Sequence, residues 1–208
     1  MNRPTFVVVF GNSDNGKDSL ADEIAVQLNM RGQTAVRCAF ADPLKETALS
    51  LLGIPLEVSY ANASVKESTS YYGSTVRYWL QWLGTEVGRD QIHRDVWVHR
   101  LADRGLARGA PFVVVSDGRF ENERVGLREY LGDRGRVFNV LIHRPSHPIP
   151  GADAHGSEAE VADLRRRVLG GELLLFDAVV ENSGELADLD AEAGRLSRLI
   201  EAVSSCRA

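Results

Sequence analysis

Cysteine is scarce in this chain of 208 residues, and long apolar runs are missing. Cys38 and Cys206 are too few and too far apart in the sequence to predict a disulfide framework or a cysteine-based metal site, and they suit a reducing compartment. No apolar stretch approaches the roughly 20 residues of a membrane-spanning helix, and no basic segment with an apolar core stands at the start. We therefore expect a cytoplasmic protein without a membrane partner.

Positive charge is also limited. The net charge of −5 argues against a nucleic acid polymer as partner, because such binding relies on clustered basic residues. Lysine in particular is rare: the chain has 21 arginines but only three lysines, Lys17, Lys45 and Lys66. An apolar content of 44% and a charged content of 25% are typical of globular proteins, and the length fits a single domain over residues 1–208.

Apolar runs alternate with amphipathic segments along the chain. The runs predict five strands, at 5–10, 34–40, 111–116, 136–143 and 177–181. Periodicity and start signals predict helices at 19–30, 43–53 (capped by Asp42), 74–90, 97–108, 121–131 and 185–203. Segment 54–73 is polar with little periodicity, which predicts an irregular insertion or flap. Segment 144–171 is also polar, and we expect it to leave the sheet as a long connection that contains one helix. Since such alternation favours parallel pairing through right-handed crossovers, we predict an α/β protein, a three-layer α/β/α sandwich with a parallel sheet.

The first predicted strand leads into the loop GNSDNGKDS at residues 11–19. Gly11, Gly16 and Lys17 match the spacing G-x-x-x-x-G-K of a phosphate-binding loop (P-loop). Glycines let backbone N–H groups line a nest for anionic oxygens, and the helix that follows adds the partial positive charge of its N-terminus. The alternative is an ordinary glycine turn between strand and helix. The residues predicted to bind ATP are Gly11, Asn12, Asp14, Asn15, Gly16, Lys17, Asp18 and Ser19.

The residue after the loop lysine is unusual. A serine or threonine that binds Mg²⁺ is the common choice, but this chain has Asp18. A carboxylate about 4 Å from a phosphate charge costs about 4 kcal/mol at a surface-like dielectric, and a cation between them lowers that cost. We therefore expect Asp18 to reach Mg²⁺, directly or through water. A helix cap is the alternative role, and both roles are compatible.

The segment SDGRFENE, residues 116–123, begins as a buried strand ends. Asp117 is placed like the acidic residue that orients Mg²⁺ in P-loop enzymes, and Arg119 can fork onto phosphate oxygens in the same cleft. Lys17, Asp117 and Arg119 are therefore the predicted catalytic group, with Asp18 and Asp117 as the metal ligands. In the alternative interpretation, Asp117 caps the next helix and Arg119 pairs with Glu123.

Two further regions carry polar groups. Arg77, Gln81 and Thr85 recur every four residues, which predicts one polar helix face able to contact a base, a sugar and a phosphate. A solvated helix face is the alternative, and the tryptophans nearby suit a core better than a stacking platform. Later, HGSE at 155–158 and the arginine run at 165–167 suggest a lid that brings cations over ATP, although charge runs are usually just solvated.

Together these segments resemble the bacteriophage deoxynucleoside monophosphate kinases. The matching pieces are GNSDNGKDS, FADPLK, LQWLGTE followed by Trp97, SDGRFENE, HRP, HGSE and VVENSGELADL, in the same order over nearly the whole chain. That family also has aspartate after the loop lysine. The resemblance implies a nucleoside monophosphate kinase-like fold and transfer of the ATP γ-phosphoryl group, with Mg²⁺, to a deoxynucleoside monophosphate. It implies the host cytoplasm if a phage encodes the protein, and it leaves a homodimer open.

On this expectation, an acceptor-binding helical region spans about 41–100 and a lid-like excursion about 144–171. The expected acceptor-binding residues are Lys45, Arg77, Gln81, Gly84, Thr85, Glu86, Arg89 and Arg119, and the expected lid residues are Arg144, His155, Glu158 and Arg165. Two alternatives remain. One is another kinase of the same fold, such as a dephospho-coenzyme A or phosphomevalonate kinase. The other is a non-catalytic nucleotide-binding protein, against which an intact Lys17, Asp117 and Arg119 argue.

Overall fold

The computed structural model describes residues 3–151 and 156–205. Its main sheet has five strands: β1 (Thr5–Phe10), β2 (Ala35–Cys38), β5 (Phe112–Gly118), β6 (Arg136–His143) and β7 (Ala178–Glu181). They lie in the order β2-β5-β1-β6-β7, and every pair is parallel. All six residues of β1 are buried, because a central parallel strand is covered on both faces.

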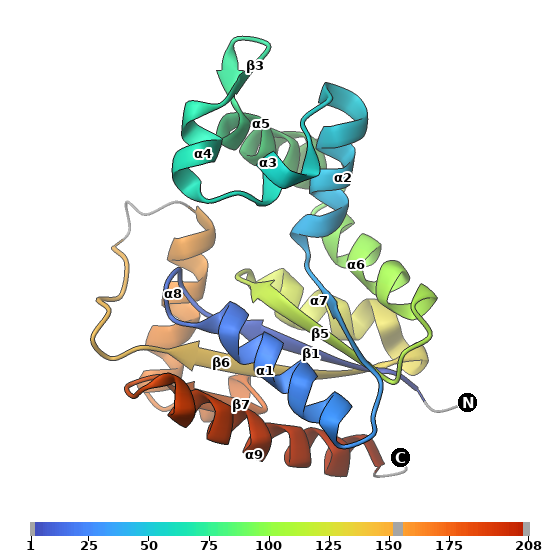
Figure 1. Ribbon diagram of the computed structural model, residues 1–208, viewed down its shortest axis with the longest axis vertical. Coiled ribbons are helices and arrows are strands. Elements are labelled where there is room, and N and C mark those ends of the chain that lie inside the picture. The colour runs from blue at the N-terminus through green and yellow to red at the C-terminus, as the bar shows by residue number, and fades with distance from the viewer. Residues whose placement is uncertain (1–2, 152–155, 206–208) are drawn as a thin grey trace. The chain divides into compact units, whose positions relative to one another are not determined.

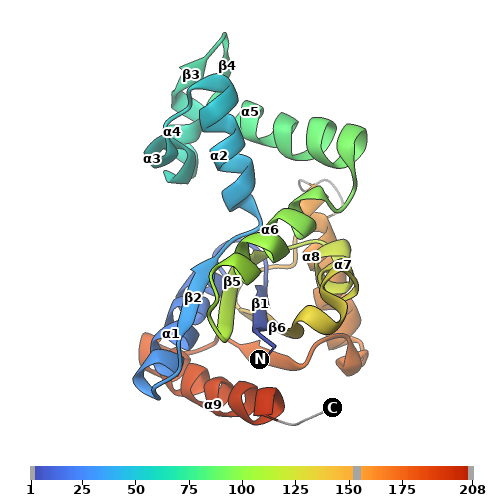
Figure 2. The same cartoon turned by 90° about the vertical axis from the view of Figure 1, so that its right-hand side faces the viewer.

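Helices cover both faces of this sheet (Figure 1, Figure 2). On one face α1 (Lys17–Met30) packs beside α9 (Leu186–Ser205), and on the other lie α7 (Glu121–Leu131) and α8 (Gly156–Leu169). Two short 3₁₀ turns, η2 (Gly132–Arg134) and η3 (Leu173–Leu175), precede β6 and β7. The expected α1 stripe of Leu20, Ile24 and Leu28 is fully buried in the core shared with α9. The predicted three-layer α/β/α sandwich with a parallel sheet is confirmed.

The chain forms two compact units, one comprising Met1–Ala39 with Ala102–Ala208 and the other Phe40–Leu101. The second unit is mainly helical. Its elements are α2 (Ala41–Leu52), α3 (Leu56–Tyr60), α4 (Ala63–Ser68), β3 (Ser70–Tyr71), β4 (Ser74–Thr75), α5 (Val76–Trp82), the π-helix η1 (Leu83–Ile92) and the start of α6 (Val96–Ala107). Its core is built from Ala48, Ile54, Val76 and Leu83. None of the described helices is long and apolar enough to cross a membrane.

Some local expectations are wrong. Segment 54–73 is not irregular but forms two short helices and the first strand of a two-stranded hairpin. In one of these helices, α4, the Asn62 side chain accepts the Val65 N–H (3.0 Å) as a cap. Short capped turns of this kind give little periodicity in sequence. Asp42 lies in the first turn of α2, whose N-cap is Phe40. Strand β5 runs on to Gly118, so Asp117 belongs to the strand itself.

Candidate active site

The loop between β1 and α1 has the backbone shape of a phosphate nest. Gly16 has a φ of 89°, and a Cβ there would lie 2.5 Å from Asn182 Nδ2, so only glycine fits. The first backbone bond into α1 runs from the Leu20 N–H to the Gly16 carbonyl (2.9 Å). The N–H groups of Lys17, Asp18 and Ser19 therefore have no partner inside the helix. They form the N-terminal end that binds anions in such folds.

Three polar side-chain atoms of the loop lie buried without a hydrogen-bond partner among the described residues. Asn15 is fully buried, and among the described residues neither its Oδ1 nor its Nδ2 finds a hydrogen-bond partner. Asn12 Oδ1 is in the same state. The Asn15 carbonyl is satisfied by Asn182 Nδ2, which donates at 3.0 Å. Because buried unpaired polar atoms cost about 1–3 kcal/mol each, those in this loop fit a site that takes water or a polar ligand.

Lys17 is nearly buried, with 6% of its surface exposed. Burial, helped by the nearby positive charge of Arg119, lowers its pKa to about 8. The carboxylates of Asp18, Asp117 and Asp14 oppose this shift. The ammonium is therefore held in a place where an additional anion would favour its charged form.

ATP binding is expected to take up a proton above pH 8. Near pH 9 most Lys17 side chains of the free protein are neutral, and bound phosphates would restore the charge, with uptake of about one proton. Near pH 7 Lys17 is already charged, and this uptake disappears. Calorimetry in buffers of different ionisation enthalpy measures the number of protons, and Lys17→Met is the control. Equal uptake near pH 9 by both proteins would assign the proton to another group.

Strand β5 brings Asp117 and Arg119 to the same edge of the sheet as the loop. Gly118 pairs with Phe10, the residue before the loop, and a Cβ at 118 would lie 2.8 Å from the Phe10 ring. Only glycine leaves room for the end of β5 beside the Phe10 ring, and the polar residues Asp117 and Arg119 flank this glycine. Burial lowers the pKa of Arg119, opposed first by the Asp117 carboxylate, yet a guanidinium stays charged at neutral pH. The structure therefore brings Lys17 near Asp117 and Arg119, and their catalytic roles stay predictions.

The two capping roles considered for the aspartates are wrong, and the contact of Arg119 with Glu123 is made by its backbone. The N-cap of α1 is Gly16, and Asp18 lies within the first helical turn. The N-cap of α7 is Phe120, so Asp117 does not cap it. Glu123 accepts the backbone N–H groups of Arg119 (2.8 Å) and Phe120 (3.0 Å), while the Arg119 guanidinium forms its ion pair with Glu158. The start of α7 is thus satisfied by Glu123, whereas no side chain caps the start of α1.

Glu158 joins the site from the first turns of α8. Its carboxylate accepts hydrogen bonds from Asn12 Nδ2 (2.9 Å), Ser13 N (3.1 Å) and Ser13 Oγ (2.7 Å) and pairs with Arg119. The sequence placed Glu158 only in a lid and left Ser13 out of the ATP-binding set. The position of Ser13 between two predicted loop residues was the one available clue to it.

The expected lid residues have different surroundings. Arg165 is 4% exposed, and its guanidinium donates to the carbonyls of Arg144 (3.1 Å) and His147 (3.3 Å). These bonds hold the turn after β6, which fits a structural role better than a cation that arrives on closure. Arg144 is half-buried, and its contact with ATP stays a prediction. His155 lies outside the described residues.

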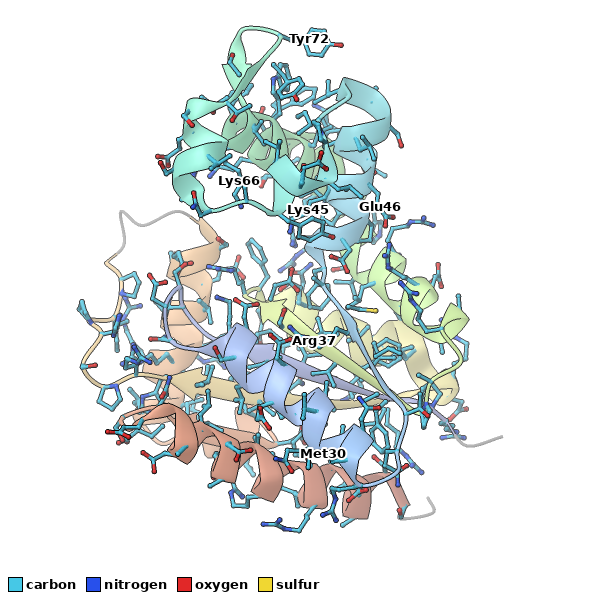
Figure 3. All side chains as sticks on the ribbon, viewed as in Figure 1. Met30, Arg37, Lys45, Glu46, Lys66 and Tyr72 are labelled. Carbon is cyan, nitrogen blue, oxygen red and sulfur yellow. The ribbon has the colours of Figure 1, made fainter. Side chains whose placement is uncertain are left out.

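Expected acceptor residues in the second unit are partly engaged in its own packing. The Gly84 carbonyl accepts the Trp97 Nε1–H (2.8 Å), and Trp97 is buried, as expected of a core residue. Arg77 forms an exposed ion pair with Glu67 (3.3 Å). Lys45, which Figure 3 labels on α2, lies 3.6 Å from the centre of the Tyr60 ring.

The predicted polar row of this unit is interrupted. Arg77 and Gln81 lie on α5, but the π-helix η1 starts at Leu83, before Thr85. A π-helix has more residues per turn, so the four-residue spacing no longer keeps Thr85 on the same face. Thr85 and Glu86 are exposed, whereas Gln81 and Arg89 are half-buried. Their roles in acceptor binding stay predictions.

No protein-family model and no curated protein matches the chain. Among solved structures, a variant of the Mycobacterium tuberculosis APS kinase CysC is similar at 16% identity and a TM-score of 0.52, covering 97% of this chain and 99% of that one. Shikimate kinase from Acinetobacter baumannii in complex with shikimate is similar at 13% identity and a TM-score of 0.50, covering 98% and 96%. At such identities the likeness concerns the fold. The chain has the nucleoside monophosphate kinase-like P-loop fold.

Proposed function

We propose that this protein is an ATP-dependent kinase of small molecules and that its acceptor is a deoxynucleoside monophosphate. The observation that carries the proposal is the grouping of Lys17, Asp117 and Arg119 beside a glycine loop whose first helical N–H groups are unused by the helix. Phosphoryl transfer needs this combination, because it depends on positioning and on neutralising charge rather than on a covalent intermediate.

Each residue has a separate task in this proposal. The loop N–H groups and Lys17 bind the ATP phosphates, and Arg119 holds the acceptor phosphate so that its oxygen lies in line with the γ-phosphorus. Asp18 and Asp117 are oxygen donors of the kind Mg²⁺ prefers, and both act electrostatically on Lys17. They would hold the ion, which would supply charge neutralisation on the transferred group.

The choice of acceptor rests on the sequence resemblance. The segments LQWLGTE and HGSE are shared with the phage kinases, and we propose that Lys45, Arg77, Gln81, Gly84, Thr85, Glu86 and Arg89 of the second unit contribute to that acceptor site. The buried thiol of Cys38 suits the reducing cytoplasm in which such an enzyme would work.

An acceptor panel tests the proposal. Full-length protein with ATP and Mg²⁺ would be offered the deoxynucleoside monophosphates, the matching ribonucleotides, dephospho-coenzyme A and phosphomevalonate, with ADP release measured by a coupled assay. We expect one deoxynucleotide to give a kcat/KM at least about tenfold above its ribonucleotide, which corresponds to about 1.4 kcal/mol of discrimination. Preference for one of the last two acceptors would favour another kinase of this fold. ATP binding without any transfer would indicate a non-catalytic nucleotide-binding protein.

A further inference from the structure

The Glu158 carboxylate ties together three parts of the main unit that are far apart in sequence. It comes from α8 and is 19% exposed. It accepts from the Asn12 side chain and from both the N–H and the hydroxyl of Ser13, and it pairs with Arg119 at the end of β5. Arg119 Nη2 also donates weakly to Ser13 Oγ at 3.4 Å, which closes the cluster. Both carboxylate oxygens are therefore satisfied by donors of the candidate active site.

The N-terminal end of α8 is itself anchored. The Asn12 side chain donates to the Glu158 carbonyl (3.0 Å), and two residues further on the Glu160 carboxylate accepts the backbone N–H of Glu121 at the start of α7 (3.1 Å). The backbone that carries Glu158 is thus held from two sides. A carboxylate on a fixed backbone can impose a direction on the long, flexible side chain of Arg119.

Glu158 leaves the N–H groups at the start of α1 unoccupied. Its loop contacts end at Ser13, whereas the N–H groups left unused by α1 belong to Lys17, Asp18 and Ser19. It also places a negative charge beside Arg119, a cation that lies near enough to lower the pKa of Lys17. The carboxylate therefore offsets repulsion between two cations without occupying the N–H groups at the start of α1.

We propose that Glu158 is a positioning residue for phosphoryl transfer, whose carboxylate aims the Arg119 guanidinium and fixes the Ser13 side of the loop. This inference rests on the proposed function and adds a residue that touches neither ATP nor acceptor. Charge on Glu158 matters because a charge-assisted pair with arginine is stronger and more directional than a neutral hydrogen bond.

The test is Glu158→Gln, which keeps the size of the side chain and one oxygen that can accept from Asn12 Nδ2 and the Ser13 N–H. It removes the charge and replaces the oxygen that faces Arg119 and the Ser13 hydroxyl with an NH2 group. We expect kcat to fall about tenfold or more, with the Kd for ATP within about twofold of the original and the melting temperature unchanged. Glu192→Gln is the matched control, because it breaks another glutamate–arginine pair, with Arg195 on α9, away from the site. It should leave kcat unchanged.

A double variant tests whether Glu158 acts through Arg119. If it does, Glu158→Gln combined with Arg119→Lys should be little worse than Arg119→Lys alone, since residues acting as one unit are not additive. Full additivity would overturn the proposal. So would a Glu158→Gln protein with normal kcat, one that loses mainly ATP affinity, or one whose activity falls only with its stability.

A spectroscopic readout separates this inference from the proposed function. In ¹⁵N-labelled protein, the Nε–H signal of Arg119, assigned by its loss in Arg119→Lys, should be sharp, and Glu158→Gln should broaden it or speed its exchange with water. That comparison needs no turnover. A native protein inactive with every acceptor would defeat the proposed function, whereas an unchanged Arg119 signal in Glu158→Gln would defeat the positioning role by itself.

Discussion

Replacing Lys17 with alanine is expected to reduce phosphoryl transfer by about a hundredfold or more while the fold stays intact. Removal of one preorganised charge-stabilising contact typically costs that much in turnover. Lys17 is the first residue of α1 and is buried, and in the proposed function its ammonium binds phosphates rather than stabilising the core. Lys17→Arg should also be poorly active, because the slot suits a compact ammonium rather than a planar guanidinium.

The stability of the alanine variant provides an internal check. Burial lowers the pKa of Lys17 to about 8, so the folded state disfavours the charged form, and below pH 8 this cation opposes folding. The variant should therefore melt at the original temperature or above it. Arg195→Ala, which removes an exposed cation from α9, is the activity control. Turnover of Lys17→Ala close to that of the native protein would refute the phosphate-loop interpretation.

Substitution of Arg119 is expected to weaken the acceptor side of the reaction while ATP binding stays close to normal. Arg119→Lys keeps the charge but loses the two-pronged geometry, and kcat/KM for the deoxynucleotide should fall about tenfold; Arg119→Ala should lose about a hundredfold, because screening and orientation both disappear. Arg119 is largely enclosed, with its side chain 23% exposed, so another side chain cannot simply take its place.

Steady-state kinetics with the acceptor varied, alongside direct ATP binding, separates the possible outcomes. A collapse of ATP affinity with an unchanged KM for the acceptor would move Arg119 to the donor side. If neither parameter changes, the contact between Arg119 and Glu158 has only a structural purpose, and the acceptor site lies elsewhere.

Much of the fold was predictable from local sequence. The apolar run Thr5–Phe10 and the helical stripe of Leu20, Ile24 and Leu28 lie where their periodicity indicated, and the helix Glu121–Leu131 has the predicted bounds. Such features depend on residues that are neighbours in sequence, because the spacing of apolar residues indicates whether one face or both faces of a helix or strand are buried. The glycine loop belongs to the same class, since its turn depends on Gly16 itself.

Other features follow from pairing between distant segments. β5 extends through Asp117 because Gly118 pairs with Phe10 of β1, more than 100 positions earlier in the chain. The long helix expected at 74–90 changes to a π-helix at Leu83, a region in which Trp97 donates a hydrogen bond to the Gly84 carbonyl and packs against Gly88. Periodicity within a segment carries no record of such contacts.

The sequence by itself determined the parallel α/β sandwich, the phosphate loop and the placing of Asp117 and Arg119 near the end of a buried strand, because each depends on local spacing and glycine freedom. Only the tertiary structure decided that Glu158 lies on that loop. Its carboxylate meets the N–H of Ser13 across 145 positions of sequence, and Asn182 reaches the Asn15 carbonyl across 167. Contacts between residues so far apart in sequence depend on how the helices pack on the sheet. The sequence around a polar residue near the C-terminus therefore contains no pattern that identifies its partner.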